Sequence, residues 1–563
     1  MKKIAKFLIV LGMMGQLSSC DYLDIVPDER AQESDTWKTE GAVRGYLYSC
    51  YGYLPANRTF GNSYWLAEEL TAVTKELFTT FKYGYYSPVS LGFTSNTWST
   101  IWNGIHQCYM FQESLKQVSN EYVTDEMKKQ YLAESNFLIA YYHFLSMRSY
   151  GPTMIIRSVI DLETPISGFP ERSSIDEVVA FINEKLDEAM SEGGLPTTWS
   201  GKDYGRATRL AALALKSRVY LYAASPLYNG NTEMYADFRS PLDGRQLIAQ
   251  EKSQAKWEIS ATQTKYAIDE VEKAKFHLYH DADAGEPSDA KPGLPNKAQR
   301  RLRYTNIDNQ TGNNPEIIWA DTRNDDYYGI QRRCPPRQTL GGKFAGISMT
   351  NCPTLQTIEA FYTKNGLPIN KDKTFDYDER YEYISAPENC DGNNYEDLVK
   401  YANFTPSSDK VMRLCTDREP RFYAWTTYHN GYFEFGKYNN EEISADPAKR
   451  AIRIHLLRDD PHGRGNRTDQ EYSISGFGNK KGVVPSAEWN VIEYPFPLFR
   501  LAELYLNYAE ALVELDRLSE AKVYLDKVRE RAGIPSVDEA WDKYSTNPGY
   551  QNTQEGMREI VRA

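Results

Sequence analysis

Apolar residues recur at helical spacing over 499–533, where two stripes follow one another along the chain. Steps of three and four residues put each stripe on one face of a helix. The first stripe comprises Leu501, Ala502, Tyr505, Ala509, Leu512 and Val513, and the second comprises Ala521, Leu525, Val528 and Ala532. The connection 514–518 is short, so the two helices must run antiparallel. We expect the second helix to begin just after Leu518, with Ser519 as its cap, and to end at Gly533.

This helix pair also fits the tetratricopeptide pattern. Tyr505, Tyr508, Ala509 and Leu512 occupy its large-large-small-large positions in the first helix. An ordinary helical hairpin is the alternative. Similar sequence patterns occur upstream, however, and one such hairpin cannot bury its apolar face alone. The pattern therefore favours a stack of helix pairs.

Further amphipathic stretches predict more helices at 40–54, 97–119, 125–150, 174–190, 206–224, 253–275 and 553–563. Gly151 and Pro152 end the third of them. Within 97–119, Trp98 lies on one helical period with Ile101 and Ile105, so we assign it to the core.

The pattern changes between residues 306 and 493. Short alternating runs such as Ile317–Trp319 indicate strands, and Asn430-Gly431 is a typical turn. The aromatic content of this region argues against disorder. The whole pattern predicts a mainly α protein: a tetratricopeptide-like helical-repeat superhelix with a long loop-rich insertion that carries short strands.

The amino terminus is typical of an exported protein. Lys2, Lys3 and Lys6 precede an apolar run at 7–14 that is too short to span a bilayer, and Leu17-Ser18-Ser19-Cys20 resembles the bacterial lipobox. We therefore expect a signal peptide at 1–19, lipidation of Cys20 and a lipid-anchored location at the cell outer membrane. An unmodified Cys in an ordinary signal peptide is the alternative. The mature chain then divides into a helical-repeat half, 20–305, and a loop-rich region with a C-terminal helix pair, 306–563.

Composition narrows the class of partner. The net charge of −12 and pI of about 5.4 disfavour nucleic acid, because no basic excess is present to displace phosphate counterions. The 42 Tyr against 22 Phe favour surfaces that meet a ligand, since Tyr joins an apolar body to a hydrogen-bonding tip. Besides Cys20 the chain has six cysteines at wide spacing, and both disulfides and buried free thiols fit that spacing.

No catalytic or metal motif is present in the sequence. The pair His277 and His280 is most simply a surface pair. Asn370, Asp372 and neighbouring Asp residues supply oxygen atoms for a structural Ca²⁺, but the Gly and the closing Glu of an EF-hand are missing. We predict no catalytic residue, no metal site and no cofactor, with a structural Ca²⁺ in this loop as the alternative.

Several separated segments together resemble the SusD/RagB family of outer-membrane lipoproteins from Bacteroidota. They are Cys20 to Pro27, Leu132–Pro152, Gly205–Ala224, Pro315–Trp319, Asp417–Phe422 and Phe499–Gly533. The resemblance implies a surface protein that captures a nutrient, most simply an oligo- or polysaccharide, and delivers it to a SusC-like TonB-dependent transporter. Glu419 and Glu493 depart from the family pattern. The family continues past a segment like 557–562, so we expect this chain to lack the family's C-terminal end.

The resemblance also places the ligand site in two regions whose individual residues vary. Sugar rings are recognised by flat aromatic faces flanked by side chains that bond hydroxyl groups. Two stretches offer that mixture, and we predict ligand contacts from Trp65, Phe81, Tyr83, Tyr85, Tyr86 and Asn96 in the first and from Arg323, Asp325, Tyr327 and Tyr328 in the second. Structural packing is the alternative for each aromatic. For the whole protein, the alternatives are a surface glycan-cleaving enzyme and a protein-binding repeat scaffold.

Overall fold

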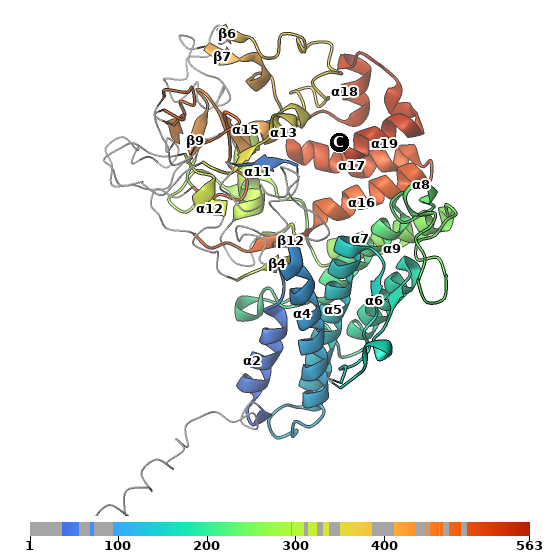
Figure 1. Cartoon of the computed structure of the whole chain (residues 1–563). Helices are drawn as coiled ribbons and strands as arrows, with labels where there is room; N and C mark the ends of the chain where they lie inside the picture. The colour runs from blue at the N-terminus through green and yellow to red at the C-terminus, as the bar shows by residue number, and fades with distance from the viewer. Residues whose placement is uncertain are drawn as a thin grey trace, which may run out of the picture.

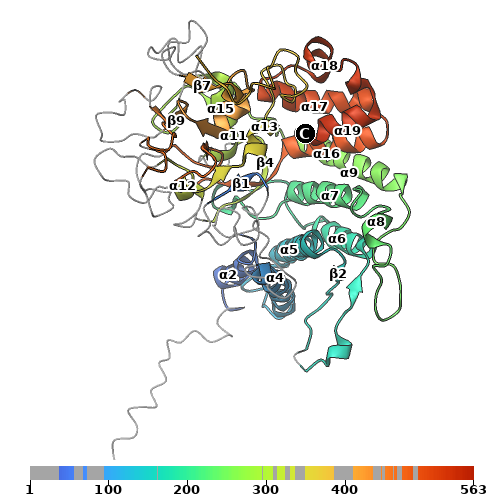
Figure 2. The same ribbon diagram turned by 45° about the horizontal axis from the view of Figure 1, so that its top comes forward.

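The computed structural model describes residues 37–55, 68–72, 94–161, 163–293, 296–308, 314–323, 330–336, 349–385, 410–434, 446, 451–460, 462–465, 472–485 and 492–563. Within these residues, long helices form a curved row, and the loop-rich part lies along one side of it (Figures 1 and 2). The helices of the row pack in the order α4, α5, α6, α7, α9, α16 and α17. The row therefore passes directly from α9 to α16, and the chain between them is an insertion.

The long helices confirm most of the boundaries predicted from periodicity. They are α2 (Glu40–Tyr51), α4 (Thr94–Leu115), α5 (Asp125–Tyr150), α6 (Ile175–Ala189), α7 (Arg209–Ala224), α9 (Gln254–Lys273), α16 (Leu501–Glu514), α17 (Leu518–Ala532) and α19 (Gln554–Arg562). A short helix that was not predicted, α18 (Val537–Tyr544), lies between α17 and α19. Local chemistry sets several ends. Thr124 caps α5, and Ser174 forms a capping box with Glu177 at the start of α6.

One predicted cap is wrong. Ser519 lies inside α17, which begins at Leu518 with Arg517 as an N-cap residue that makes no side-chain bond. The turn before it is made by Asp516 in the left-handed conformation, with φ of 58°. At the other end Gly533 stops the helix as predicted.

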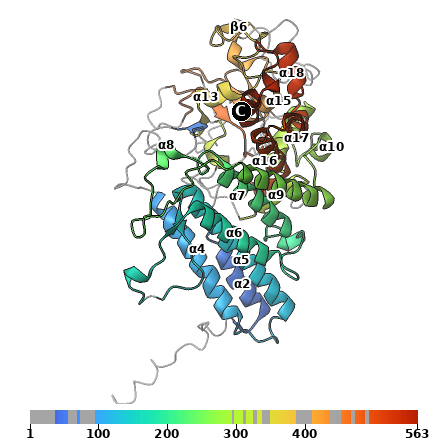
Figure 3. The same ribbon diagram turned by 90° about the vertical axis from the view of Figure 1, so that its right-hand side faces the viewer.

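The core follows the helical row. One continuous apolar cluster runs from α2 through α5 and α7 to α19. Small residues allow close approach along α7, where Ala211, Ala212 and Ala214 are fully buried. Trp98 is only half-buried and packs edge-on against Trp102 and Tyr150, with ring centroids 5.4 and 4.9 Å away. Viewed from the side, α2, α4, α5 and α6 form an inclined bundle, and α7 and α9 lie between this bundle and α16 (Figure 3).

The insertion contains short elements. Its helices are α10 (Asp281–Ala284), α11 (Lys297–Ile307), α12 (Ile330–Arg333), α13 (Leu355–Ala360) and α15 (Pro420–Trp425), and α8 (Thr232–Tyr235) precedes α9 in the helical half. Within the described residues, strands pair two by two and antiparallel: β1 (Leu70–Thr71) with β5 (Cys352–Pro353), β2 (Thr153–Met154) with β3 (Arg172–Ser173), β4 (Ile317–Asp321) with β12 (Phe496–Arg500), β6 (Tyr383–Ser385) with β7 (Lys410–Met412), β8 (Thr426–Tyr428) with β11 (Phe477–Asn479), and β9 (Tyr432–Glu434) with β10 (Ala451–Arg453). The predicted strand at 317–319 is thus the first part of β4.

The ladder of β4 and β12 joins the insertion to the helical row. Trp319 of β4 stacks on Phe499 of β12 and meets the rings of Phe137 and Tyr141 on α5 edge-on, at 5.0 and 5.2 Å. Strand β12 then runs directly into α16. This arrangement holds Arg323, the second residue after β4, beside the helical half.

The described cysteines are buried free thiols. They are Cys50, Cys108, Cys334, Cys352 and Cys415. Between the two alternatives left open by their spacing, the structure supports free thiols for these five. Cys390 lies outside the described residues.

Candidate ligand-binding site

Most of the predicted ligand contacts, and the predicted lipidation residue, lie outside the described residues. These are Cys20, Trp65, Phe81, Tyr83, Tyr85, Tyr86, Asp325, Tyr327 and Tyr328. Asn96 lies in the first turn of α4, and its side chain is also outside the description. Of the predicted ligand contacts, Arg323 alone has a side chain that lies within the described residues. The roles of the other predicted residues stay predictions.

Arg323 fastens the end of β4 to the end of α2. Its guanidinium makes a two-pronged bond to Asp321, with Nε–Oδ1 at 2.9 Å and Nη2–Oδ2 at 2.7 Å. The remaining N–H groups donate to the carbonyl oxygens of Leu54 at 2.8 Å, Pro55 at 3.1 Å and Gly52 at 3.5 Å. All five guanidinium N–H groups therefore have protein acceptors. The observed role of Arg323 is to hold residues 52–55 beside residues 321–323.

The second predicted binding stretch leaves the described part of the chain at this junction, because it begins with Arg323. The aromatic residues of the first stretch lie in 56–67 and 73–93, outside the described residues. A cavity of about 290 Å³ opens at the junction. Its lining includes Tyr48, Tyr51, Lys202, Tyr204, Arg206 and Arg323. A second cavity of about 380 Å³ shares Tyr204, Gly205, Arg206 and Ala320 with the first and adds Trp199 and Asn314. Ligand pockets in proteins occupy roughly 300–1,000 Å³.

Aromatic rings and hydroxyl groups line the two cavities. Tyr48, on the outer face of α2, is 41% exposed. Burial raises the pKa of Tyr48, and it raises the pKa of Tyr204 to about 12. Both hydroxyls therefore stay protonated at neutral pH and both donate and accept hydrogen bonds. The Arg206 guanidinium covers one face of the Trp199 ring, with its Cζ 4.2 Å from the ring centroid. A ligand could therefore pack only on the other face of this ring.

A buried ion pair fixes the wall between the cavities. Arg206 bonds Glu134 of α5 through both Nε, at 3.2 Å, and Nη2, and its Nη1 bonds Asp203 at 2.8 Å. Tyr51 donates its hydroxyl to the same Glu134 at 2.6 Å and accepts the backbone N–H of Ala207 at 2.9 Å. The wall is thus held by α2, α5 and the loop before α7 together.

Gly205 is required at this wall. Its φ is +101°, a conformation that L side chains rarely adopt. A Cβ here would lie 2.8 Å from the side chain of Thr322, and the Gly205 carbonyl accepts the indole N–H of Trp319 at 2.9 Å. The Gly205-Arg206-Ala207-Thr208 segment of the sequence pattern therefore shapes the cavity and caps α7, since the Thr208 hydroxyl accepts the N–H of Ala211 at 3.0 Å.

Sequence reasoning missed Tyr48, Trp199 and Tyr204. Tyr48 is one aromatic among many on a predicted helix, and the other two lie in a short connection with Gly201 and Gly205. Aromatic residues between glycines in a loop before a predicted helix were the available signal. Their convergence with residues 321–323 depends on tertiary packing.

Solved structures show which fold this is. The chain is similar to the structure named BT4246, with 28% sequence identity, a TM-score of 0.73, and coverage of 93% of this chain and 86% of that one. A SusD-like protein, BF3747 from Bacteroides fragilis, follows at 20% identity and TM-score 0.64, with 95% and 84% of the two chains covered. A SusD-like carbohydrate-binding protein, BF0978 from the same organism, has 18% identity and TM-score 0.59, with 93% and 83% covered. The fold is SusD-like.

Family models match both halves of the sequence. Residues 315–563 match the SusD family, and residues 21–221 match a family described as starch-binding and associating with the outer membrane. The chain therefore belongs to the SusD family, as its sequence pattern predicted. None of the curated proteins compared with it matches the sequence. Within the described residues, no helix combines the length and apolar character needed to cross a membrane.

Proposed function

We propose that this protein binds an oligo- or polysaccharide at the cell surface and delivers it to a SusC-like TonB-dependent transporter of the outer membrane. The observation that carries the binding part is the aromatic and polar cleft at the Arg323 junction, where the second predicted binding stretch begins. Membership in the SusD family supports it, and so does the likeness to a protein whose title calls it carbohydrate-binding.

The chemistry of the cleft suits a sugar. Tyr48 offers a partly exposed ring for the C–H face of a pyranose, and the hydroxyls of Tyr48 and Tyr204 stay protonated to bond its hydroxyl groups. The fixed ion pair of Arg206 with Glu134 keeps this frame rigid, which lowers the entropy lost on binding. We assign the protein a binding role rather than a catalytic one.

Calorimetric titration of the purified protein with a panel of oligosaccharides, beginning with malto-oligosaccharides, tests the proposal. We expect Tyr48→Ala and Tyr204→Ala each to weaken the binding of the recognised sugar by about tenfold, or about 1.4 kcal/mol. Tyr383→Ala is the matched control, because Tyr383 is also 41% exposed but lies on β6, outside the cleft.

The same titration tests the residues predicted from sequence. We expect Tyr83→Ala, Tyr85→Ala and Tyr327→Ala to weaken binding as well, since each removes an aromatic face from a predicted binding stretch. Unchanged affinity in all five cleft and stretch variants would contradict this site. Failure to bind any glycan of the panel would contradict the function, and new reducing ends after incubation would instead support a glycan-cleaving enzyme.

Delivery and anchoring have their own tests. We expect a transporter barrel of the SusC type to co-purify with the protein from detergent-solubilised outer membranes of its source cells. We expect Cys20→Ala to abolish the incorporation of labelled fatty acid and to release the protein from the membrane fraction. A Cys20→Ala protein that stays on the membrane would contradict the lipid anchor.

A further inference from the structure

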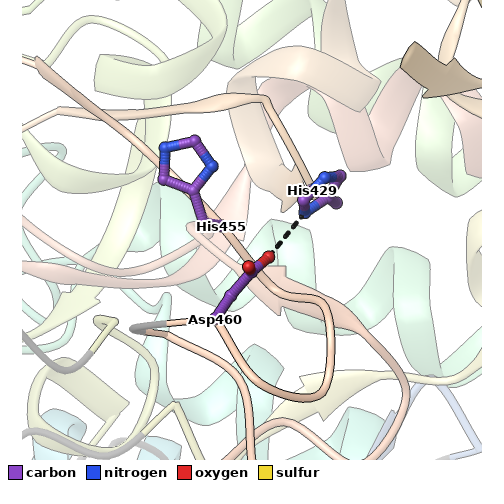
Figure 4. Close-up of side chains that lie close together, drawn as sticks. All are labelled: His429, His455 and Asp460. Atoms are coloured by element: carbon purple, nitrogen blue, oxygen red, sulfur yellow. Dashed lines mark ion pairs between the residues drawn. The ribbon is translucent and has the colours of Figure 1, made fainter. Parts of the chain in front are cut away.

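Three side chains with metal-binding atoms meet in the loop-rich half, away from the cleft. They are His429, His455 and Asp460, and among the described residues their donor atoms form a group in which all lie within 4.8 Å of one another (Figure 4). His429 and Asp460 face each other, with His429 Nδ1 and Asp460 Oδ2 at 3.3 Å.

Strand pairing brings the two histidines together. His429 follows β8 and stands in the turn that leads to β9, where Asn430 has φ of 68°. Strand β10 pairs with β9, and the ladder continues one step further because Ile454 N–H donates to the Gly431 carbonyl at 2.9 Å and Asn430 N–H donates to the Ile454 carbonyl at 2.6 Å. The next residue, His455, therefore leaves the ladder beside His429.

A tight turn returns Asp460 to the same place. Leu457 N–H donates to Asp460 Oδ2 at 2.9 Å, and Asp460 N–H donates to the Leu457 carbonyl at 3.0 Å. This backbone bond orients the carboxylate, as the outer partners of metal ligands commonly do. Backbone N–H groups thus bond two of the three donor side chains, His429 and Asp460, and strand pairing brings His455 beside them.

The spacing suits a tetrahedral ion. Bonds of about 2.0–2.1 Å from zinc to nitrogen and oxygen put neighbouring ligand atoms roughly 3.3–3.4 Å apart. The pair His429–Asp460 already has this separation, and one ring nitrogen of His455 lies within 4.8 Å of both donor atoms. Two imidazoles and one carboxylate suit Zn²⁺ and similar ions, whereas Ca²⁺ and Mg²⁺ prefer oxygen atoms throughout.

The histidine that faces the carboxylate is held by a backbone hydrogen bond. His429 Nδ1 accepts the N–H of Leu456 at 3.1 Å. A metal ion at Nδ1 would take the place of that N–H group. The side chains of His429 and Asp460 are 17% and 29% exposed, which gives an ion access from solvent.

We propose that His429, His455 and Asp460 bind one divalent transition-metal ion, of which Zn²⁺ fits best, with the fourth position open to water or to a ligand atom. The ion clamps the β8–β9 turn to the chain that follows β10. This site is independent of the proposed glycan cleft, so either proposal stands if the other fails.

Titration of the chelator-stripped protein with Zn²⁺ tests this site. We expect one Zn²⁺ per chain with a Kd in the micromolar range or below, no competition from millimolar Ca²⁺ or Mg²⁺, and a rise in Tm on addition of Zn²⁺. His455→Ala and Asp460→Asn are expected to weaken Zn²⁺ binding at least tenfold and to remove the rise in Tm. His277→Ala is the matched control, because it removes one of a stacked histidine pair, His277 and His280, in which ring centroids are 5.5 Å apart.

Circular dichroism establishes that each variant is folded, and Asp460→Asn, which keeps the size of the side chain, answers the question if His455→Ala does not fold. The proposal is overturned if no Zn²⁺ binds at one equivalent, if both site variants bind it as the wild type does, or if His277→Ala loses binding to the same extent.

Discussion

At the scale of single residues, buried charges with multiple partners join segments that are far apart in the sequence. Glu316, fully buried just before β4, accepts bonds from Arg500 at 2.7 Å, from Arg531 at 2.6 Å and from the backbone N–H of Tyr279 at 3.0 Å. Two segments of the family pattern, Pro315–Trp319 and the two ends of Phe499–Gly533, therefore meet at one carboxylate. Removing one partner from such a cluster leaves uncompensated charge in the core.

We predict that Glu316→Gln lowers the free energy of unfolding at pH 7 by about 3–5 kcal/mol. Burial opposes ionisation of Glu316, but the charges of Arg531 and Arg500 outweigh it and hold its pKa below the ordinary value. The ionised group therefore stabilises the fold above an unfolded pKa of about 4.3, and this stabilisation is lost as pH falls through the lower folded pKa. The difference in free energy of unfolding between wild type and Glu316→Gln should thus become smaller below pH 4.

Urea unfolding of both proteins at a series of pH values measures this difference. Glu184→Gln is the control, because its ion pair with Arg157 at 2.7 Å lies at the surface, and such pairs contribute about 0–1 kcal/mol. A Glu316→Gln effect no larger than this control, or one that does not depend on pH, would contradict the account.

Glu419, which departs from the family pattern, is also a buried charge with several partners. Glu419 is fully buried, accepts the N–H of Tyr362 at 2.8 Å and pairs with Arg421 two residues on. Its neighbour Arg418 is also buried and donates to backbone carbonyls, including those of Leu414 at 2.6 Å and Ile358 at 2.7 Å. Sequence alone does not reveal the partners Tyr362 and Ile358, because they lie about 60 residues away in the chain. Glu493, the other departure, is exposed.

At the scale of elements, helix ends show where local sequence decides structure. Gly533 has φ of +76° at the end of α17, and its N–H donates to the Glu530 carbonyl at 2.9 Å. A Cβ at Gly533 would also lie 3.3 Å from Pro420 and 3.5 Å from Ala298. The left-handed conformation and the close neighbours both favour glycine.

We predict that Gly533→Ala lowers the free energy of unfolding by about 1–2 kcal/mol. Gly45→Ala is the matched control: Gly45 lies inside α2 with no atom within 4 Å of a built Cβ, and the same substitution there should stabilise by about 0.5–1 kcal/mol. Thermal unfolding of the two variants should therefore show Tm shifts of opposite sign. Shifts of the same sign would contradict the conformational argument.

Helices with a local cap and many apolar residues were predicted well, and α5, which is buried on all sides from Ala133 to Met147, begins and ends at the predicted residues. Helix α11 was missed because its sequence, KAQRRLRYTNI, is largely polar. Its Arg300 and Arg303 are buried, and their guanidinium groups donate to the carbonyls of Gly285 and Ala424, respectively. No local sequence pattern reveals these partners. The short helix α18 was missed as well, since its eight residues bury only three apolar positions.

At the scale of the whole molecule, the order of segments in space differs from their order in the chain. Helix α9 packs on α16, and the chain between them returns to the helical row through β4 and β12. The sequence pattern predicted the stack and the insertion. It did not predict the cleft, because the lining residues Tyr48, Tyr204 and Arg323 come from three distant segments and meet only after the insertion has docked.

Arg323 is the residue through which this docking reaches the cleft. It joins Leu54 and Pro55 to Asp321 across about 270 positions of the chain. We predict that Arg323→Gln speeds hydrogen exchange of the amides at 52–55 and lowers the free energy of unfolding by about 1–3 kcal/mol, because residues 52–55 lose their hydrogen bonds to the guanidinium. We expect glycan binding to weaken about tenfold, since these residues form one edge of the cleft. Arg157→Gln, which removes an exposed ion pair, should change none of the three. Hydrogen exchange by mass spectrometry and calorimetric titration of the same samples measure these effects.

Two outcomes would contradict this account. Weaker binding without faster exchange at 52–55 would show that Arg323 contacts the ligand directly, as the sequence predicted. Faster exchange with unchanged affinity would show that the junction is not part of the binding site.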